Sequence, residues 1–317
     1  MSSHTSAATG TAAATAIRSR RKPTAPAGPR GTYTKHAYPL WFYVPGGAVY
    51  LTLFIVPTVA AFYFSLTRWD LVNAQFIGLA NYARFFAEPA LTQGLTNTLI
   101  YAGVTSAAKV VLGLLLAVLL TSGLRLRDFM RSVVFFPVLV STVGVGLTFQ
   151  VLMHPSKGAI NALLELVGIA GPGWLTDPHL ALLSVAAVDV WKGVGMATVI
   201  YIAGILAIPT EYYEAAKVDG ASAVQQFFRI VLPLALPATS TVIILSLIGG
   251  LRSFDLIWAM TRGGPGFTSD VLASVVYKQY QAGFYGLSTA GNVVLFLLVA
   301  LIAVPLNFFL TKKEVDL

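Results

Sequence analysis

The chain has 317 residues, of which 56% are hydrophobic and 11% are charged, whereas soluble globular proteins carry about 25% charged residues. The apolar residues fall in long blocks, so the sequence predicts an integral membrane protein and excludes the soluble class. The absence of cysteine excludes disulfides, thiol catalysis and cysteine-based metal sites, and membrane topology explains the net charge of +8 better than nucleic-acid binding does.

Residues 1–37 form the first predicted segment, which is rich in Ala, Thr, Ser, Pro and Arg and nearly free of large apolar side chains. This composition predicts a disordered tail. The basic run RSRRK is followed by a full-length apolar block and not by a short apolar core with a cleavage site, which excludes a secretory signal peptide. We interpret the run as a topology anchor that contacts anionic lipid.

Six apolar blocks follow, each close to the roughly 20 residues that a transmembrane helix needs. They lack the short alternating pattern of a β-barrel, so helices are expected, and Pro57, Pro137 and Pro305 can kink theirs. The predicted fold class is therefore all-α, a polytopic membrane protein with six core helices in a domain of residues 38–312. The predicted spans are residues 41–66, 97–121, 132–152, 180–208, 234–260 and 286–310.

Lysine and arginine are distributed unevenly between the two sides of the predicted bundle. The side that holds both termini carries thirteen of them and the other side carries five. Because cytoplasmic segments are enriched in these residues, both termini, including a tail of residues 313–317, are predicted to be cytoplasmic. The segment of residues 209–233, between the fourth and fifth spans, then lies on the same side.

Local signals in residues 209–233 predict a helix, a glycine turn and a second helix. Asp219-Gly220 is a turn in which glycine can take the left-handed conformation, and Ser222 with Gln225 fits a capping box. The second helix is expected to end before Pro233. The aromatic residues of this hairpin either pack beneath its own bundle or dock into a groove on another protein, and the pattern alone favours packing.

The same segment carries a longer pattern: Glu-Ala-Ala, three residues, Gly, nine residues, then Ile-x-Leu-Pro. It resembles the EAA motif in membrane subunits of bacterial ATP-binding-cassette (ABC) importers. The segments FIGLANYARFF (76–86), FFPVLVS (135–141), VDVWKGVG (188–195) and 254–279 are similar to the larger permease subunit of sugar uptake systems, of the maltose/glycerol-phosphate permease-like family. The motif residues are Glu214, Ala215, Ala216, Asp219, Gly220, Ile230, Leu232 and Pro233.

This resemblance implies a type I ABC importer permease in a bacterial cell membrane. The hairpin would be a coupling helix in a cleft on a cytoplasmic ATPase subunit, with Glu214 pairing with a basic group, Ala215 and Ala216 allowing close approach, and Gly220 making the turn. The implied partners are two ATPase subunits, a second homologous permease, an extracytoplasmic solute-binding protein and a carbohydrate substrate, which moves by alternating access.

The chain is not expected to hydrolyse ATP itself. A phosphate-binding loop of the form G-x-x-x-x-G-K-[ST] needs a Gly-Lys pair, and no lysine in this sequence follows a glycine. No enzyme or metal constellation is found either, so no cofactor is expected and ATP would be used by the partner subunit.

Charged residues inside the predicted spans are costly, so each is either paired or functional. Asp189 and Lys192, and likewise Arg252 and Asp255, are three residues apart and could form ion pairs, whereas Lys109 has no obvious partner in its own helix. The alternative is a polar wall of a translocation path, and both interpretations stay open. The candidate path residues are Asp189, Trp191, Lys192, Arg252, Asp255 and Asn292.

Two other functions compete with the importer. One is a secondary transporter or channel in which the cytoplasmic hairpin is a gating element, which internal inverted repeats would favour. The other is a membrane receptor or scaffold whose hairpin binds a signalling partner.

Overall fold

A computed structural model describes residues 40–123 and 125–312, so the two predicted tails, residues 1–37 and 313–317, lie outside the described ranges. The chain divides into two compact units, Met1–Phe54 and Ile55–Leu317. The described part of the first unit is helical, and Pro45 stands in the first turn of its α-helix, where the missing N–H costs no hydrogen bond. Its elements are η1 (Leu40–Tyr43), α1 (Val44–Tyr50) and most of the π-helical η2 (Leu51–Ile55).

The second unit starts with α2 (Val56–Ser65), a two-stranded antiparallel hairpin of β1 (Thr67–Trp69) and β2 (Ala74–Phe76), and α3 (Ala80–Ala87). The Asp70 carboxylate closes the turn between the strands by accepting hydrogen bonds from the backbone N–H groups of residues 72 and 73, which lowers the pKa of this carboxyl group. This small hairpin is the one departure from the predicted all-α class within the described residues.

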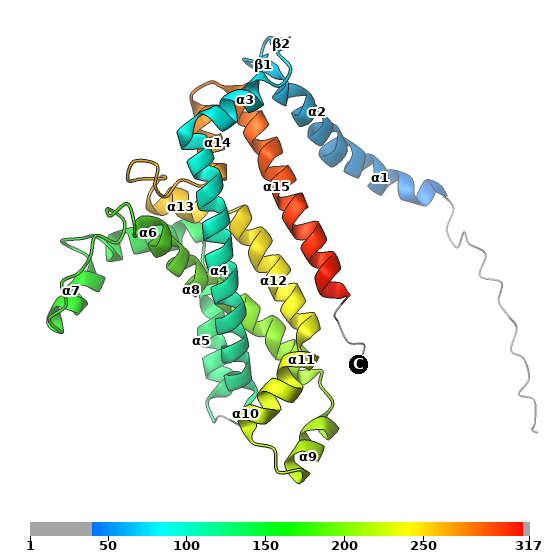
Figure 1. The fold of residues 1–317 in the computed structure, drawn as a ribbon, viewed down its shortest axis with the longest axis vertical. Helices are drawn as coiled ribbons and strands as arrows, with labels where there is room; N and C mark the ends of the chain where they lie inside the picture. The colour runs from blue at the N-terminus through cyan, green and yellow to red at the C-terminus, as the bar shows by residue number, and fades with distance from the viewer. Residues whose placement is uncertain (1–39, 124, 313–317) are drawn as a thin grey trace, which may run out of the picture. The chain divides into compact units, whose positions relative to one another are not determined.

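Three long helices form the frame of this unit: α4 (Pro89–Thr121), α8 (Ala181–Leu206) and α15 (Tyr285–Thr311). Helix α4 packs against α8 and α12 (Leu236–Leu251), and α12 also packs against α15 (Figure 1). Glycines permit the closest approaches, since a β-carbon at Gly113 of α4 would lie 2.8 Å from the side chain of Ala197 of α8.

Two further spans are bent. Helices α5 (Arg127–Leu139) and α6 (Thr142–Leu152) meet at 97°, because the backbone at Val140 and Ser141 is extended, three residues after Pro137. Pro137 itself stays inside α5, so the bend does not lie at the proline where a kink was predicted but at the two residues between the helices. Pro305 likewise stands inside an unbroken α15.

The described residues therefore contain four helices long and apolar enough to cross a membrane, and six spans if each bent pair counts as one, as predicted. The four are Trp41–Ser65 and α4, α8 and α15, and the second bent pair is Ala223–Leu234 with Leu236–Leu251, at 67°. The predicted fifth span, residues 234–260, is too long: α12 ends at Leu251 and residues 255–260 form a separate helix, α13 (Asp255–Met260).

The loop that follows α13 is fixed to α4 by polar contacts. The Asn97 side chain donates hydrogen bonds to the backbone oxygens of Thr268 and Asp270 at 2.9 and 2.8 Å. The fully buried Asp270 carboxylate pairs with Lys278 at 2.5 Å and accepts a hydrogen bond from Ser274. These contacts fix α14 (Leu272–Gln281) beside α4.

The remaining elements are α7 (Ala159–Leu166) and the hairpin helices α9 (Thr210–Val218), α10 (Ala223–Gln226), η3 (Phe227–Val231) and α11 (Leu232–Leu234). Figure 1 shows α9 and α10 at the end of the second unit opposite to β1, β2 and α3. The core of this unit has three apolar clusters, and the one nearest the hairpin contains Tyr201, Ile205 and Val231.

Candidate functional site

The motif hairpin begins with α9, which starts directly after Pro209 and ends in a glycine turn. Gly220 has φ +73°, its N–H donates to the oxygen of Lys217, and the N–H of Ala221 donates to the oxygen of Ala216. This pair of hydrogen bonds is the Schellman arrangement, which requires a left-handed residue at this position. The predicted glycine turn is therefore confirmed.

The second half of the hairpin opens with the predicted capping box. Ser222 N–H donates to Oε1 of Gln225 at 2.8 Å, and the Gln225 N–H donates to Oγ of Ser222 at 3.3 Å. The expectation that this helix ends before Pro233 is wrong, since helical structure continues to Leu234. The π-helical turn η3 ends at Val231, which places the proline in the first turn of α11, where its missing N–H is tolerated.

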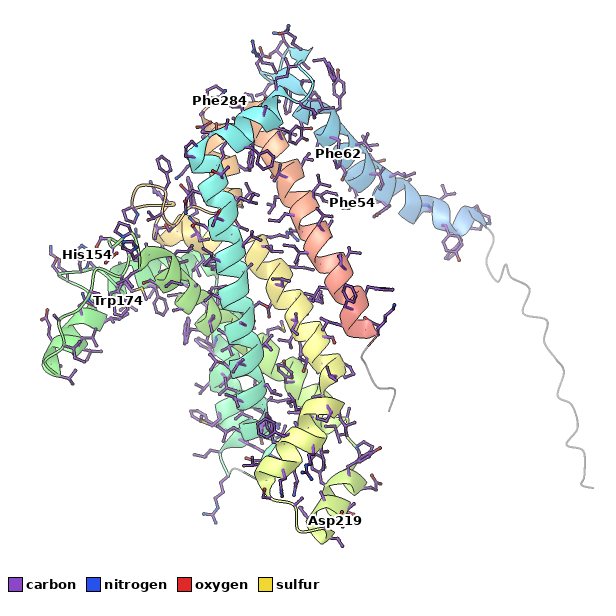
Figure 2. All side chains as sticks on the ribbon, in the orientation of Figure 1. Phe54, Phe62, His154, Trp174, Asp219 and Phe284 are labelled. Carbon is purple, nitrogen blue, oxygen red and sulfur yellow. The ribbon has the colours of Figure 1, made fainter. Side chains whose placement is uncertain are left out.

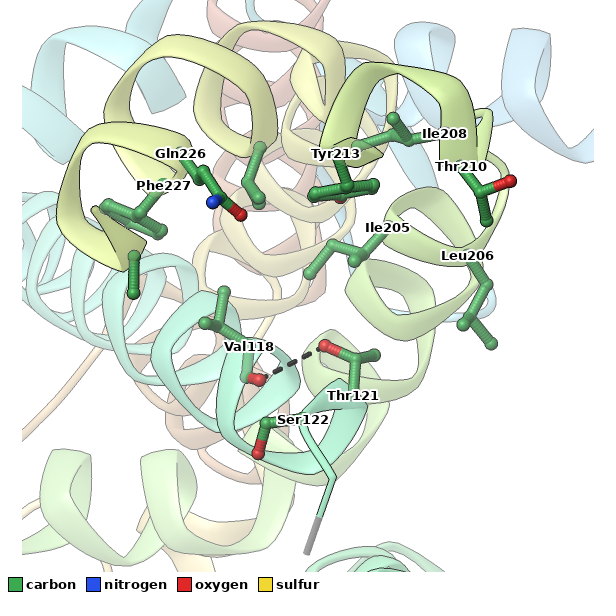
Figure 3. A pocket seen from close by; sticks show the side chains of 12 residues that line it. Val118, Thr121, Ser122, Ile205, Leu206, Ile208, Thr210, Tyr213, Gln226 and Phe227 are labelled. Carbon is green, nitrogen blue, oxygen red and sulfur yellow. Dashed lines mark hydrogen bonds between the residues drawn. The ribbon is translucent and has the colours of Figure 1, made fainter. Parts of the chain in front are cut away.

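Two aromatic residues attach the hairpin to its own bundle. Tyr213 of α9 and Phe227 of η3 are half-buried and pack against the apolar cluster at the ends of α4, α8 and α12. They line a cavity of about 400 Å³ together with residues of α4 and α8 (Figure 3). The hydroxyl of Tyr213 is buried without a hydrogen-bond partner among the described residues, and burial raises its pKa.

Other side chains of the hairpin point away from the bundle and are exposed. No residue of α9 is buried, Glu214 and Ala215 are exposed, and Glu214 forms no ion pair with any described residue. Tyr212 and Phe228 are exposed as well, at 49% and 61%. Figure 2 shows Asp219 at the tip of the hairpin. We call this surface the hairpin face and define it by Tyr212, Glu214, Ala215, Asp219 and Phe228.

The sequence did not distinguish between the aromatic residues of the hairpin, but in the structure they fall into a buried pair and an exposed pair. Tyr213 and Phe227 face the bundle, whereas their neighbours Tyr212 and Phe228 face outward. Among the other motif residues, Ala216, Ile230 and Pro233 are half-buried and Leu232 is 37% exposed. Internal packing therefore holds for Tyr213 and Phe227, whereas Tyr212 and Phe228 do not pack beneath the bundle.

The charged residues within the predicted spans form the second candidate site, and two of them make an ion pair. Lys109 of α4 pairs with Asp189 of α8, with 2.6 Å between Nζ and Oδ2, and their side chains are 10% and 22% exposed. The suggested pair of Asp189 with Lys192 is therefore replaced by a pair between two helices. Gly193 makes room for it, since a β-carbon there would lie 2.7 Å from Cε of Lys109.

Arg252 and Asp255 form no ion pair with each other in the described part of the chain, although their spacing suggested one. Both side chains are exposed, and they flank the break between α12 and α13. Arg252 caps the C-terminal end of α12 and Asp255 stands in the first turn of α13. Each charge therefore has the sign that the adjoining helix dipole favours.

Asn292 of α15 lies at a different place from Asp189. It lines a pocket of about 250 Å³ whose walls include Phe254, Tyr277 and Tyr280. Trp258 joins this aromatic group, with ring centroids 5.5 Å from Phe254. None of the three aromatic residues of this pocket was predicted as a site residue, because they come from segments that only the fold brings together.

Trp191 of α8 is 45% exposed, and its ring centroid lies 5.2 Å from that of Phe149 in α6. Of the candidate path residues, only Asn292 lines the aromatic pocket, while Asp189, Trp191 and Lys192 share α8.

Comparison with known proteins gives consistent matches. Residues 109–311 match the family model described as "Binding-protein-dependent transport system inner membrane component". The chain is 36% identical over 284 residues to the probable ABC transporter permease protein YurN of Bacillus subtilis, covering 87% of this chain and 97% of that protein. It is 33% identical over 253 residues to the trehalose/maltose transport system permease protein MalF of Thermococcus litoralis, covering 79% and 86%.

Among solved structures, a chain in the crystal structure of a bacterial ABC transporter involved in the import of the acidic polysaccharide alginate has a similar fold. The TM-score is 0.77 with 23% sequence identity, over 86% of this chain and 94% of that chain. At this identity, the likeness establishes the fold alone.

Proposed function

Because the chain belongs to the family of inner membrane components of binding-protein-dependent transport systems, we propose that it forms part of the path by which an ATP-driven importer takes up a sugar or sugar derivative. The matches confirm the predicted resemblance to carbohydrate importer permeases and the polytopic membrane fold, and they do not favour a secondary transporter or channel. Relatives named for trehalose/maltose and arabinooligosaccharide transport support a saccharide substrate.

The hairpin face is the observation that carries the coupling part of this proposal. Its apolar side chains, Tyr212 and Phe228, are exposed on the same hairpin as an acidic residue, Glu214, that has no ion-pair partner among the described residues. Exposed apolar anchors beside a charge are typical of a protein-binding surface. The hairpin binds an ATPase subunit there, with Glu214 facing a basic group and Ala215 allowing close approach.

Motion of the ATPase reaches the spans through the other face of the hairpin. Tyr213 and Phe227 join α9 and η3 to the ends of α4 and α8, so displacing the hairpin displaces those helices. The cavity of about 400 Å³ beside these rings leaves space for the hairpin to shift against the bundle. Coupling of this kind needs contacts that differ between the two states of the transporter.

The remaining partners complete the importer. A second, homologous permease covers the exposed apolar faces of the spans, and an extracytoplasmic binding protein delivers the substrate. The termini and the hairpin lie on the cytoplasmic side, as the lysine and arginine distribution predicts. Helix α8 contributes Asp189, Trp191 and Lys192 to the translocation path, and Arg252, Asp255 and Asn292 contribute polar groups at other places along it.

Reconstitution tests this function. The chain, its second permease and two ATPase subunits are incorporated in liposomes with the binding protein outside, and saccharide uptake is measured with and without internal ATP. ATP-dependent uptake is expected. If the purified chain carries no ATPase subunit and uptake proceeds equally without ATP, a secondary transporter describes the chain better.

A further inference from the structure

Lys192 is a charged residue in a membrane span that has no counter-charge among the described residues. It is half-buried and forms no ion pair with any of them. The nearest acidic residue in sequence within its helix, Asp189, is already paired with Lys109 of α4. An ammonium group in a membrane is retained where it meets an anion or water.

Lys192 stands near the middle of α8 and far from both of its ends. It stands eleven residues after the start of α8 at Ala181 and fourteen residues before its end at Leu206. At 1.5 Å per residue, these intervals are roughly 17 and 21 Å. The four-carbon stem of lysine is shorter than either interval, so snorkelling along α8 does not bring the ammonium group to either end of the helix.

The charges of the surrounding helices do not balance. Helices α4, α8, α12 and α15 contain three charged residues in all, Lys109, Asp189 and Lys192, and therefore carry a net charge of +1. Helix α5, which also packs against α8, has charges only at its start, where Arg127 and Arg131 both pair with Asp128. Arg252 and Asp255 do not change this balance, because they add one charge of each sign at helix ends that favour them. One positive charge near the middle of the span is left for a ligand.

We propose that the transported saccharide carries an anionic group, such as a carboxylate, sulfate or phosphate, and that the Lys192 ammonium group binds it during passage. A charge-assisted hydrogen bond to such an anion supplies the counter-charge that the described helices lack. This inference rests on the proposed import function and specifies its substrate class. Asp189 does not oppose the anion, since Lys109 neutralises it.

The test uses the complete reconstituted importer and three probes: maltose, digalacturonate and the methyl ester of digalacturonate. The acid and its ester differ chiefly in charge. Uptake of digalacturonate is expected to exceed uptake of its ester at least tenfold. The Lys192→Met variant should lose this preference and Lys192→Arg should keep it. Lys157→Met removes a lysine from the loop before α7 and serves as the matched control.

The outcomes separate the two claims. Equal uptake of the acid and its ester would contradict the claim that the substrate is anionic. So would uptake of maltose alone, if the Lys192→Met variant takes it up equally well. Both outcomes leave the import function intact. If the Lys192→Met complex loses the second permease on gel filtration, the ammonium group contacts that subunit and not the substrate. This result would also overturn the inference. Absence of ATP-dependent uptake of all three probes would overturn the inferred binding of a carboxylated saccharide, and the import function itself would be contradicted if the purified complex also contained no ATPase subunit.

Discussion

Lys109 and Asp189, 80 residues apart in the sequence, form an ion pair that joins α4 to α8 with 2.6 Å between Nζ and Oδ2. The stem of Lys109 passes over Gly193, where any larger residue would collide with it. Both partners lie inside helices long and apolar enough to cross the membrane. The pair therefore fixes how two central spans pack, and it sets the charge balance on which Lys192 depends.

Removing one partner of this pair should destabilise the protein more than removing both. A lone buried charge costs about 3–5 kcal/mol, and the partial exposure of Asp189 places the expected loss at the lower end. Lys109→Met and Asp189→Asn should each lower the thermal unfolding midpoint in detergent, and the double variant should recover most of the loss. Losses that simply add in the double variant would show that the two residues do not interact.

Gly220 should be required for its backbone conformation and not for lack of space. Its φ is +73° and a β-carbon at this position would have no atom within 4 Å, so Gly220→Asn should be tolerated. Gly220→Val places a β-branched residue in the left-handed region at a cost of at least about 1–2 kcal/mol and should abolish substrate-stimulated ATP hydrolysis while membrane insertion stays normal.

Gly168 offers the matched control for this variant. It has φ +77° and equally open surroundings, but it follows α7 and lies outside the hairpin. Gly168→Val should leave stimulated ATP hydrolysis unchanged. Fully stimulated ATP hydrolysis in Gly220→Val, or an equal loss of stimulated hydrolysis in Gly220→Val and Gly168→Val, would contradict a specific role of the hairpin turn in coupling.

Glu214 should contribute to ATPase binding through its charge. Glu214→Gln keeps the shape of the side chain and should weaken co-purification of the ATPase about tenfold, the effect of losing roughly 1.4 kcal/mol of a charge-assisted contact. Glu211→Gln, also exposed and three residues earlier in α9, is the control and should have no effect. Identical binding curves for Glu214→Gln and the unaltered chain would refute the assignment.

Tyr213 should act through its ring and not through its hydroxyl. The hydroxyl is buried without a partner among the described residues, so Tyr213→Phe should retain or slightly raise stability and keep coupling. Tyr213→Ala removes a half-buried ring and should cost on the order of 1–2 kcal/mol, with loss of stimulated ATP hydrolysis. Loss of coupling in Tyr213→Phe would indicate a hydrogen bond that the proposed mechanism does not contain.

The hairpin could be predicted from sequence because its determinants are local. Gly220 terminates α9, and Ser222 with Gln225 begins α10, through hydrogen bonds that span at most five residues. The continuation of the helix past Pro233 could not be predicted, because it depends on a π-helical turn in the preceding residues.

The contacts of the polar residues within the spans could not be predicted, because their determinants are not local. Spacing on one helix suggested Asp189 with Lys192, but the partner of Asp189 lies on another helix, and only the packing of α4 on α8 brings the two together. The pocket of Phe254, Tyr277 and Asn292 likewise joins three segments that are separated in sequence. The sequence identified Asp189 and Asn292 as candidate path residues, but the residues that contact them could be identified only from the fold.

The central claim, that the hairpin face binds an ATPase subunit, can be tested by photo-crosslinking. The chain contains no cysteine, so Val218→Cys at the exposed end of α9 introduces a single thiol for a benzophenone maleimide, and Leu166→Cys at the exposed end of α7 provides the control. In membranes with the complete importer, the adduct at position 218 should contain an ATPase subunit and the adduct at position 166 should not. An ATPase that co-purifies with the chain but never crosslinks to position 218 would contradict the account.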